Sequence, residues 1–342
     1  MIAVKKLGIL LEKTEFEFEN EGVLNPAVIK EGNNVHIFYR ALKKGNYSSI
    51  GYCRLDGPLK IIERNQKPII YSQYDYESHG VEDPRITKIE NTYYLTYTAF
   101  DGNNALSALA TSTNLKDFQK LGLITPQMNF EKFKCLLEYC ETKTEEKYTR
   151  FYEFLKIEMS GNSFNLWDKD VVFFPRKINK KFVFLQRIRP GIQMVSFNSI
   201  EDLTQIFWDN YFKNFSEYIV LEPKFNHEAS YIGAGCPPIE TKDGWILIYH
   251  GVESTADGRV YHACAALLDL EDPSKEISRL KYPLFSPELS YEKKGVVNNV
   301  VFPTGTALFD DQLYIYYGAG DEQIAVASVN FNTLLDELKK TN

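Results

Sequence analysis

The fold of this chain is decided by the stretch His79-Gly80-Val81-Glu82-Asp83-Pro84-Arg85-Ile86-Thr87-Lys88-Ile89-Glu90-Asn91-Thr92-Tyr93-Tyr94-Leu95-Thr96-Tyr97. A proline, a few apolar residues, a polar turn and an alternating aromatic-rich segment are typical of an antiparallel hairpin. Pro84 fixes its own φ and favours an extended conformation at Asp83, so the backbone sets the direction of this carboxylate. Asp83 beside Arg85 suits a proton donor or a sugar-hydroxyl ligand, and equally a structural ion pair.

The same pattern occurs five times along the chain. Its copies are anchored by prolines at Pro26, Pro84, Pro175, Pro238 and Pro303. Apart from one longer step, the spacing is about sixty residues, which fits one four-stranded sheet per copy, and five such sheets around an axis form a β-propeller. We therefore predict an all-β chain in which residues 1–342 form a single five-bladed β-propeller domain. A β-sandwich with accidental internal similarity is the alternative.

The longer step contains a helical insert between the second and third copies, at residues 128–162. From 130 to 159 the chain has neither proline nor glycine and is rich in Glu, Lys, Leu, Phe and Tyr, which predicts one or two helices. The insert could pack on the edge of a sheet, cover the pocket as a lid, or form an oligomer contact. A short C-terminal helix is expected at 332–340.

Composition excludes several classes of partner. The formal net charge of -7 argues against nucleic acid or an anionic membrane surface. Five cysteines without a CxxC pair indicate reduced thiols rather than disulfides or a zinc site, so we expect a cytoplasmic protein without a metal. No apolar run is long enough to suggest an export signal or a membrane span.

Polar residues stand at the strand ends, which gather around the central channel of a propeller. Asp83 is the acid among them. The others are donors to anions or hydroxyls: Asn25, Arg40, Lys169, Arg187, His250 and Tyr261. Each alone has a structural explanation, such as a solvated charge at a strand edge. Together, one acid facing cationic and hydroxyl groups suits the binding of an oxyanion such as phosphate.

Four segments resemble glycoside hydrolase family 130, and they occur in order over nearly the whole chain apart from the insert. They are Gly80-Val81-Glu82-Asp83-Pro84-Arg85, Gly233-Ala234-Gly235-Cys236-Pro237-Pro238-Ile239, Gly244-Trp245-Ile246-Leu247-Ile248-Tyr249-His250-Gly251-Val252 and Tyr317-Gly318-Ala319-Gly320-Asp321. The resemblance implies a five-bladed propeller and inverting phosphorolysis of β-mannosides to α-mannose 1-phosphate. A minority of the family are β-1,2-mannosidases.

The resemblance also implies roles for individual residues. Asp83 corresponds to the catalytic acid. Phosphate-binding positions are matched by Lys169, Arg187, His250 and Tyr261, and substrate-binding positions by Asn25, Arg40 and Asp321, with Glu82 and Arg85 beside the acid as further candidates. Lys169 stands where arginine is expected in many phosphorylases, which keeps the charge but loses bidentate geometry.

The chemistry agrees with a phosphorylase. An inverting hydrolase needs a second carboxylate to activate water, whereas phosphate is already an anionic nucleophile and needs cations to position it. Asp83 would need a pKa raised by burial or by Glu82, or a proton relay through a sugar hydroxyl. We predict an inverting β-mannoside phosphorylase that uses a β-mannoside oligosaccharide and inorganic phosphate without a cofactor. A β-mannosidase and a non-catalytic glycan-binding propeller are the alternatives, and the acceptor sugar, the linkage and any homo-oligomer stay open.

Overall fold

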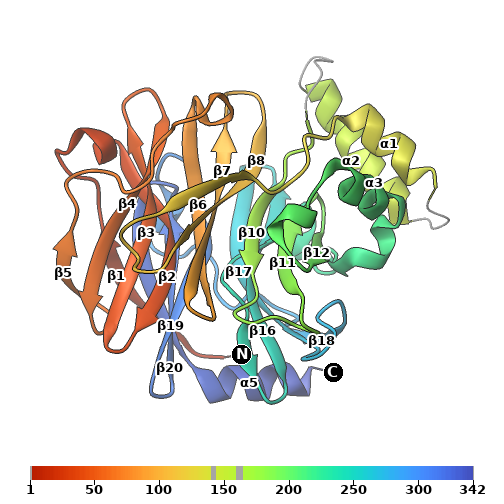
Figure 1. Cartoon of the computed structure of the whole chain (residues 1–342). Helices are drawn as coiled ribbons and strands as arrows, with labels where there is room; N and C mark the ends of the chain where they lie inside the picture. Colours follow the sequence, from red (N-terminus) through yellow and green to blue (C-terminus); the bar gives the residue numbers. More distant parts are fainter. Residues whose placement is uncertain (1, 140–143, 159–164, 342) are drawn as a thin grey trace.

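The computed structural model describes residues 2–139, 144–158 and 165–341, and antiparallel strands are its main secondary structure (Figure 1), which confirms the predicted dominance of β-sheet. The strands form five antiparallel units, which we call repeats 1 to 5. Repeat 1 contains β2 (Gly22–Glu31), β3 (Asn34–Lys43), β4 (Tyr47–Asp56) and β5 (Lys60–Arg64). Repeat 2 contains β6 (Gly80–Ile89), β7 (Thr92–Phe100), β8 (Ala105–Ser112) and β9 (Gln119–Leu123). A parallel pair between Ser48 and Gly80 joins these two repeats into one larger sheet.

The remaining repeats follow in chain order. Repeat 3 contains β10 (Lys169–Phe173), β11 (Phe182–Arg187), β12 (Ile192–Phe197) and β13 (Ile219–Leu221). Repeat 4 contains β14 (Tyr231–Ala234), β15 (Ile239–Thr241), β16 (Gly244–Thr255), β17 (Gly258–Leu268) and β18 (Glu276–Arg279). Repeat 5 contains β19 (Val301–Phe309), β20 (Gln312–Ala319) and β21 (Gln323–Asn330), and β1 (Val4–Leu11) from the start of the chain pairs with β21 as its outer strand.

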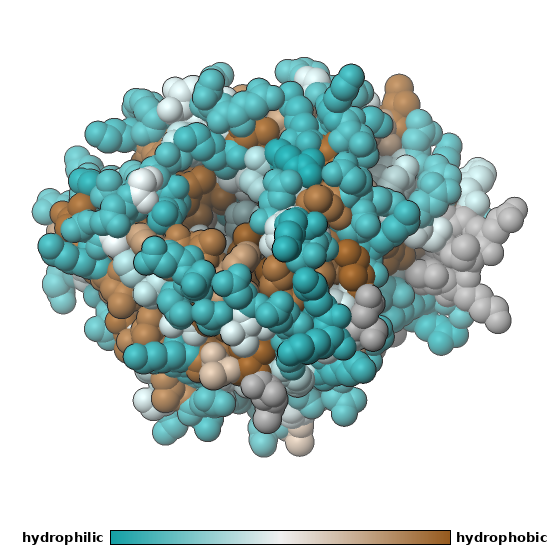
Figure 2. All heavy atoms as spheres, turned by 90° about the horizontal axis from the view of Figure 1, so that it is seen from below, coloured by the Kyte–Doolittle hydropathy of each residue, from teal (hydrophilic) through white to brown (hydrophobic). Residues whose placement is uncertain are grey.

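The first strands of the repeats lie beside one another in the middle of the molecule. β2 contacts both β6 and β19, β6 contacts β10, and β10 contacts β14. Figure 2 shows one face, largely hydrophilic, with apolar side chains around a central hollow.

The first strand of repeats 1, 2 and 3 is interrupted by a β-bulge, at which one residue has a different backbone conformation from its neighbours. The register shifts between Leu24 and Ala27, between Glu82 and Arg85, and between Lys169 and Val172. At these bulges Asn25, Asp83 and Asp170 have φ of 50°, 47° and 60°, a left-handed conformation that Asn and Asp tolerate better than other side chains. The extended conformation predicted at Asp83 is therefore wrong, because the bulge overrides the usual preference of a residue before proline. In repeat 3 the predicted anchor Pro175 lies after β10, because there the bulge is formed at Asp170 without a following proline.

A buried glutamate and a tyrosine stabilise four of the repeats. The tyrosine hydroxyl donates to the carboxylate, and a Lys or Arg pairs with the same group. The sets are Glu19 with Tyr39 and Arg64, Glu77 with Tyr97 and Lys120, Glu228 with Tyr249 and Arg279, and Glu292 with Tyr317 and Lys6. In repeat 3 Gln186 takes the place of the tyrosine and donates to the hydroxyl of Tyr211. A buried carboxylate is stable only with such partners, so these sets fix three short 3-10 helices and, at Glu292, the short helix α4 (Ser290–Lys293) against their sheets.

The helices of the described residues are α1 (Phe130–Leu137), α2 (Thr144–Glu158), α3 (Gln205–Lys213), α4 (Ser290–Lys293) and α5 (Phe331–Lys340). α5 lies at one end of the sheets (Figure 1). α1 and α2 fall within the segment 128–162, and with α3 they lie beside β11 and β12 (Figure 1). Phe133 of α1 and Phe212 of α3 belong to one apolar cluster with Phe184 of the sheet. Among the described residues, no helix is both long enough and apolar enough to cross a membrane.

Candidate active site

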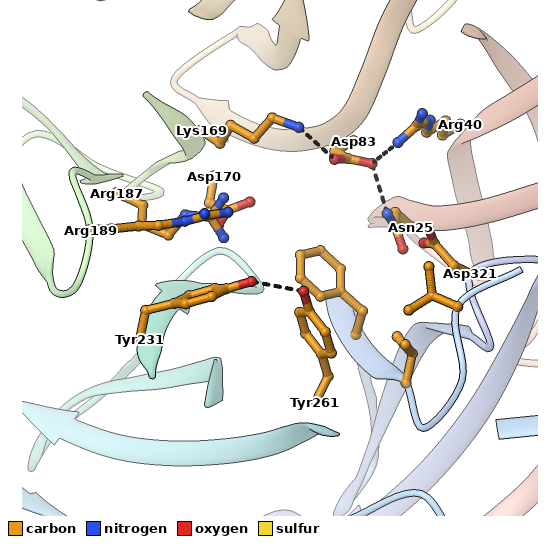
Figure 3. Close-up of a pocket in the computed structure, with 13 residues that line it drawn as sticks. Asn25, Arg40, Asp83, Lys169, Asp170, Arg187, Arg189, Tyr231, Tyr261 and Asp321 are labelled. Carbon is orange, nitrogen blue, oxygen red and sulfur yellow. Dashed lines mark hydrogen bonds and ion pairs between the residues drawn. The ribbon is translucent and has the colours of Figure 1, made fainter. Parts of the chain in front are cut away.

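A cavity of about 170 Å³ is lined by residues from all five repeats, and it contains both acidic and basic groups. Its polar lining consists of Asn25, Arg40, Asp83, Lys169, Asp170, Arg187, Arg189, Tyr231, Tyr261 and Asp321 (Figure 3). The three bulge residues Asn25, Asp83 and Asp170 all reach it, because the left-handed backbone turns their side chains out of the normal alternation of the strand.

Asp83 lies at one end of the cavity among hydrogen-bond donors. Asn25 Nδ2 donates to Asp83 Oδ1 at 2.7 Å, and Arg40 Nη1 is 3.4 Å from the same oxygen. Lys169 Nζ is 4.0 Å from Asp83 Oδ2 and 3.3 Å from an oxygen of Glu82. Burial raises the pKa of Asp83, but Arg40, Lys169 and the Asn25 hydrogen bond outweigh it and hold the pKa below its ordinary value. The free protein therefore lacks the raised pKa that direct proton donation by Asp83 would need, and Asp83 is ionised in it.

Asp321 lies beside this group and behaves in the opposite way. Burial raises the pKa of Asp321 to about 6, Arg40 opposes that rise, and the negative charges of Asp83 and Glu82 add to it. The pKa values of Asp83 and Asp321 are thus shifted in opposite directions, because Asp83 holds the closer hydrogen bonds and ion pairs.

The other end of the cavity gathers arginine and tyrosine side chains. Arg187 Nη1 is 2.7 Å from Asp170 Oδ2, and the Arg189 guanidinium lies 4.3 Å from the ring centroid of Tyr231. The hydroxyls of Tyr231 and Tyr261 are 2.7 Å apart. Burial raises the pKa of Tyr231, but Arg189 and Arg187 lower it further than burial raises it. A site that favours the anionic form of a phenol also favours a bound anion.

His250 is buried within β16 and does not line the cavity. Its Nε2 lies 3.2 Å from Arg187 Nη1. Burial and the nearby Arg187 and Arg85 hold the pKa of His250 well below its ordinary value, so the imidazole is neutral. It therefore orients Arg187 from behind rather than adding charge to the cavity.

Seven of the ten residues singled out from the sequence line the cavity, and the structure brings these together. They are Asn25, Arg40, Asp83, Lys169, Arg187, Tyr261 and Asp321. The other three, Glu82, Arg85 and His250, are buried behind it. Arg85 donates to the carbonyl of Gly235 and pairs with Asp170 at 3.5 Å, while Glu82 accepts from Arg40 at 2.8 Å.

Sequence reasoning missed Asp170, Arg189 and Tyr231. One signal for Asp170 was available, since Asp170 precedes the apolar Val171-Val172-Phe173-Phe174 much as Asp83 precedes a strand. No local pattern marks Arg189 or Tyr231, whose directions depend on packing between repeats.

Residues that could bind a metal occur away from this cavity. Among the described residues, His227, Glu228 and Cys264 have ligand atoms close together. Glu228 already accepts hydrogen bonds from Tyr249, Arg279 and the backbone N–H of Lys224, like the equivalent glutamates of the other repeats. These hydrogen bonds give Glu228 a structural role in repeat 4, and a metal would have to compete with its Tyr249 and Arg279 partners.

Comparison with known proteins decides the family. A sequence model described as β-1,4-mannooligosaccharide phosphorylase matches residues 9–340. The chain belongs to glycoside hydrolase family 130. Among its family 130 relatives, a 1,2-β-oligomannan phosphorylase of Thermoanaerobacter sp. (strain X514) is 36% identical, over 96% of this chain and 97% of the relative. A β-1,2-mannobiose phosphorylase of the same organism is 35% identical, over 94% of each chain.

Solved structures of family 130 share the fold. The β-1,2-mannobiose phosphorylase from Listeria innocua, in complex with β-1,2-mannobiose, superposes with a TM-score of 0.73. The alignment covers 99% of this chain and all of the other at 22% identity. At this identity the likeness supports the fold alone.

Proposed function

We propose that this family 130 protein is an inverting β-mannoside phosphorylase. It would cleave a β-mannosidic bond with inorganic phosphate, giving α-mannose 1-phosphate and a sugar shortened by one mannose. The observation that carries the proposal is the arrangement in Figure 3, in which Asp83 and a cluster of arginines and tyrosines occupy opposite ends of one cavity.

The architecture that supports this site is a five-bladed β-propeller, with repeats 1 to 5 as its blades. The contacts of β2 with both β6 and β19 fit a ring of sheets, and the pairing of β1 with β21 fits closure of that ring by the two ends of the chain. We treat residues 1–342 as one catalytic domain, with residues 128–162 as an insert within it.

Each end of the cavity has a role. Asn25, Arg40 and Asp321 would bind the hydroxyls of the mannose that is transferred, beside Asp83. At the other end Arg187, Arg189, Tyr231 and Tyr261 would bind phosphate, with His250 holding Arg187. Lys169, which lies beside Asp83, would bind phosphate from the mannose end.

In the reaction, a phosphate oxygen forms a bond to the anomeric carbon as the glycosidic C–O bond on the opposite face breaks, which inverts the configuration. The proton for the leaving oxygen comes from Asp83, directly or through a sugar hydroxyl. Asp83 is ionised in the free protein, so the proton must be acquired as the substrates bind. The negative charge of phosphate raises the pKa of Asp83, and exclusion of water by the sugar acts in the same direction.

β-1,2-linked mannosides are the substrates we favour. Two relatives that align over nearly the whole chain are named for them, at 36% and 35% identity. The reaction needs no metal or organic cofactor, because the phosphate itself supplies the nucleophile. We place the enzyme in the cytoplasm, where phosphate is available.

A β-mannosidase is the second candidate, because Asp170 places a carboxylate at the phosphate end of the cavity. This carboxylate is engaged by two guanidinium groups, those of Arg187 and Arg85. A group fixed in this way is a poor base for activating water, so the arrangement supports phosphorolysis.

The test is turnover of β-1,2-mannobiose by the purified protein with and without inorganic phosphate. We expect α-mannose 1-phosphate, observed by ³¹P NMR, and no mannose release without phosphate. Equal mannose release in both conditions would establish a hydrolase instead. A parallel assay with β-1,4-mannobiose tests the linkage, and unchanged turnover after dialysis against a chelator tests the absence of a metal. If no mannoside is turned over but one binds equally well to Asp83→Asn, the protein is a glycan-binding propeller.

A further inference from the structure

The loop between β11 and β12 carries Arg189 into the phosphate end of the cavity. Arg187 ends β11, and Ile188, Arg189, Pro190 and Gly191 connect it to β12. The other cavity cations each have a carboxylate within 4.0 Å: Arg40 and Lys169 contact Glu82 and Asp83, and Arg187 contacts Asp170. Arg189 has no such partner among the described residues, and its Nε, although buried, makes no hydrogen bond with them.

A half-buried guanidinium without a carboxylate partner must be held in place by its backbone and by packing. Burial and the charge of Arg187 both lower the pKa of Arg189, which means that the site disfavours its positive charge when no anion is bound. One side of the guanidinium stacks on Tyr231. The loop backbone supplies the rest of the support.

That backbone is held by α2, the second helix of the insert. The hydroxyl of Tyr152 accepts a hydrogen bond from the backbone N–H of Arg189 at 3.3 Å. One turn away on the same face of the helix, the hydroxyl of Tyr148 accepts from Gln193 Nε2 at 3.3 Å. Gln193 in turn accepts from the N–H of Ile188 at 2.7 Å and donates to its carbonyl at 2.9 Å. The two tyrosines therefore fix both sides of the loop.

Gly191 shows how closely the helix approaches. A Cβ at this position would lie 2.4 Å from the hydroxyl of Tyr148 and 2.7 Å from the carbonyl of Leu221. Only glycine leaves room for the tyrosine, so any larger side chain would push the loop away from α2.

α2 is itself rigidly packed. The rings of Tyr148 and Phe215 are 4.9 Å apart in an edge-to-face arrangement, and Tyr152 packs edge-to-face against Phe133 of α1. Both tyrosines are almost completely buried, at 0% and 1% exposure. Such packing suits a helix that supports the loop in a fixed position. A lid that opens and closes would expose the face of α2 that carries the two tyrosines.

We propose that the helical insert is a positioning element for the anion site, acting through Tyr152 and Tyr148 on the loop that carries Arg189. This inference rests on the proposed phosphorolysis. A loop loosened from α2 would let Arg189 turn towards solvent, because no carboxylate holds it. Phosphate affinity would then fall while the mannose end of the cavity, on repeats 1, 2 and 5, stays intact.

The test compares Tyr152→Phe with the wild type in the KM for phosphate, the KM for β-1,2-mannobiose and direct phosphate binding by calorimetry. We expect the KM and the Kd for phosphate to rise about fivefold to tenfold, the effect of one lost hydrogen bond. The KM for mannobiose should stay within about twofold of wild type. Gly191→Ala, which disturbs the contact from the loop side, should reproduce the effect.

Tyr218→Phe is the matched control, since Tyr218 stacks on Tyr211 in the same apolar cluster and contacts α3 rather than the loop. It should leave both KM values unchanged. An unchanged phosphate Kd in both Tyr152→Phe and Gly191→Ala would overturn the inference. Equal changes in the KM for phosphate and the KM for mannobiose, in proportion to a drop in melting temperature, would also overturn the inference. They would show that Tyr152 and Gly191 only stabilise the fold. A wild type that binds phosphate without turning over any mannoside would refute the proposed function, and the calorimetric comparison would still test the inference.

Discussion

Asp170 and Arg187 form a buried ion pair in the wall of the cavity, with Arg187 Nη1 2.7 Å from Asp170 Oδ2. Arg85 Nη2 lies 3.5 Å from the other oxygen of Asp170, so one carboxylate holds two guanidinium groups. All three side chains are at most 5% exposed. The position of Arg187, and with it the anion site, therefore depends on an acid from the bulge of β10.

Asp170→Asn should destabilise the protein, because it leaves two buried guanidinium groups without a counter-charge. We expect a loss of about 3 kcal/mol in the free energy of unfolding, measured by urea denaturation. Saturating phosphate should restore more stability in this variant than in the wild type, since the bound anion would replace the missing charge.

Glu146→Gln is the control for Asp170→Asn, since it breaks an exposed pair with Arg150 on α2. It should change the free energy of unfolding by less than about 1 kcal/mol. A similar small effect for Asp170→Asn would show that water or a conformational change compensates Arg85 and Arg187.

The buried glutamate–tyrosine pairs give a second prediction. Tyr97→Phe removes a hydroxyl that donates at 2.7 Å to the fully buried Glu77. It should cost about 1–3 kcal/mol in the free energy of unfolding, because the carboxylate loses a partner that water cannot replace. Kinetic constants should not change, as Tyr97 does not line the cavity.

Tyr93→Phe offers a comparison on the same strand. Tyr93 donates to Glu31 at 2.9 Å, but the Glu31 side chain is 35% exposed and water can replace the hydroxyl. We expect a loss below about 1 kcal/mol. Equal losses for the two variants would contradict the importance of burial in the Glu77 pair.

The strands of this fold could be predicted because their sequence signal is local. Alternating aromatic residues such as those at 93–97 mark a half-buried strand directly. The glutamates of the glutamate–tyrosine pairs could not be predicted from the sequence. Glu77, for example, lies in the 3-10 helix η2 (Asp75–Glu77), distant in sequence from Tyr97, and no periodic pattern connects the two residues. In repeat 3 the proline spacing placed the first strand wrongly, because the bulge at Asp170 is not followed by a proline and Pro175 lies after β10.

The candidate site divides in the same way. Asp83 and Asn25 stand next to prolines in a repeated pattern, so their approach to one axis could be inferred. The approach of Arg189 could not be inferred, because the direction of its side chain depends on α2 and on Tyr231, which are distant in sequence. His250 was expected to end a strand, but β16 continues beyond it and places its ring behind Arg187.

Asp83→Asn should abolish catalysis while preserving the binding of phosphate. An amide cannot donate a proton to the leaving oxygen as an acid does, so we expect turnover to fall by at least about a thousandfold. Phosphate binding, followed by the shift in melting temperature, should be equal or tighter, because removing the negative charge of Asp83 favours an anion. Loss of activity without retained phosphate binding would point to a collapsed cavity instead.

Asp321→Asn should make the protein more stable at neutral pH, and the pH dependence of that gain is the clearest test of its buried environment. In the folded protein burial raises the pKa of Asp321 from 3.8 to about 6. Between about pH 4 and pH 6 the folded state therefore binds a proton that the unfolded state has lost, so the stability of the wild type falls as pH rises through this window. Above about pH 6 the wild type has lost nearly all of the affected free energy of unfolding. The loss is at most about 3 kcal/mol, because the pKa of Asp321 is about two units higher in the folded than in the unfolded protein. Asparagine avoids this cost, so urea denaturation should show the variant more stable than wild type at pH 7.5 and equal to it below pH 4.

Asp310→Asn, at an exposed turn, is the control for this pH series and should show no such difference. A constant offset between Asp321→Asn and wild type from pH 4 to pH 8 would mean that Asp321 titrates normally and that Arg40 fully compensates its burial. The KM for mannobiose should rise in Asp321→Asn, because the same carboxylate that weakens the fold above pH 6 lines the mannose end of the cavity. A gain in stability together with poorer sugar binding is the expected result for a polar group kept for its ligand.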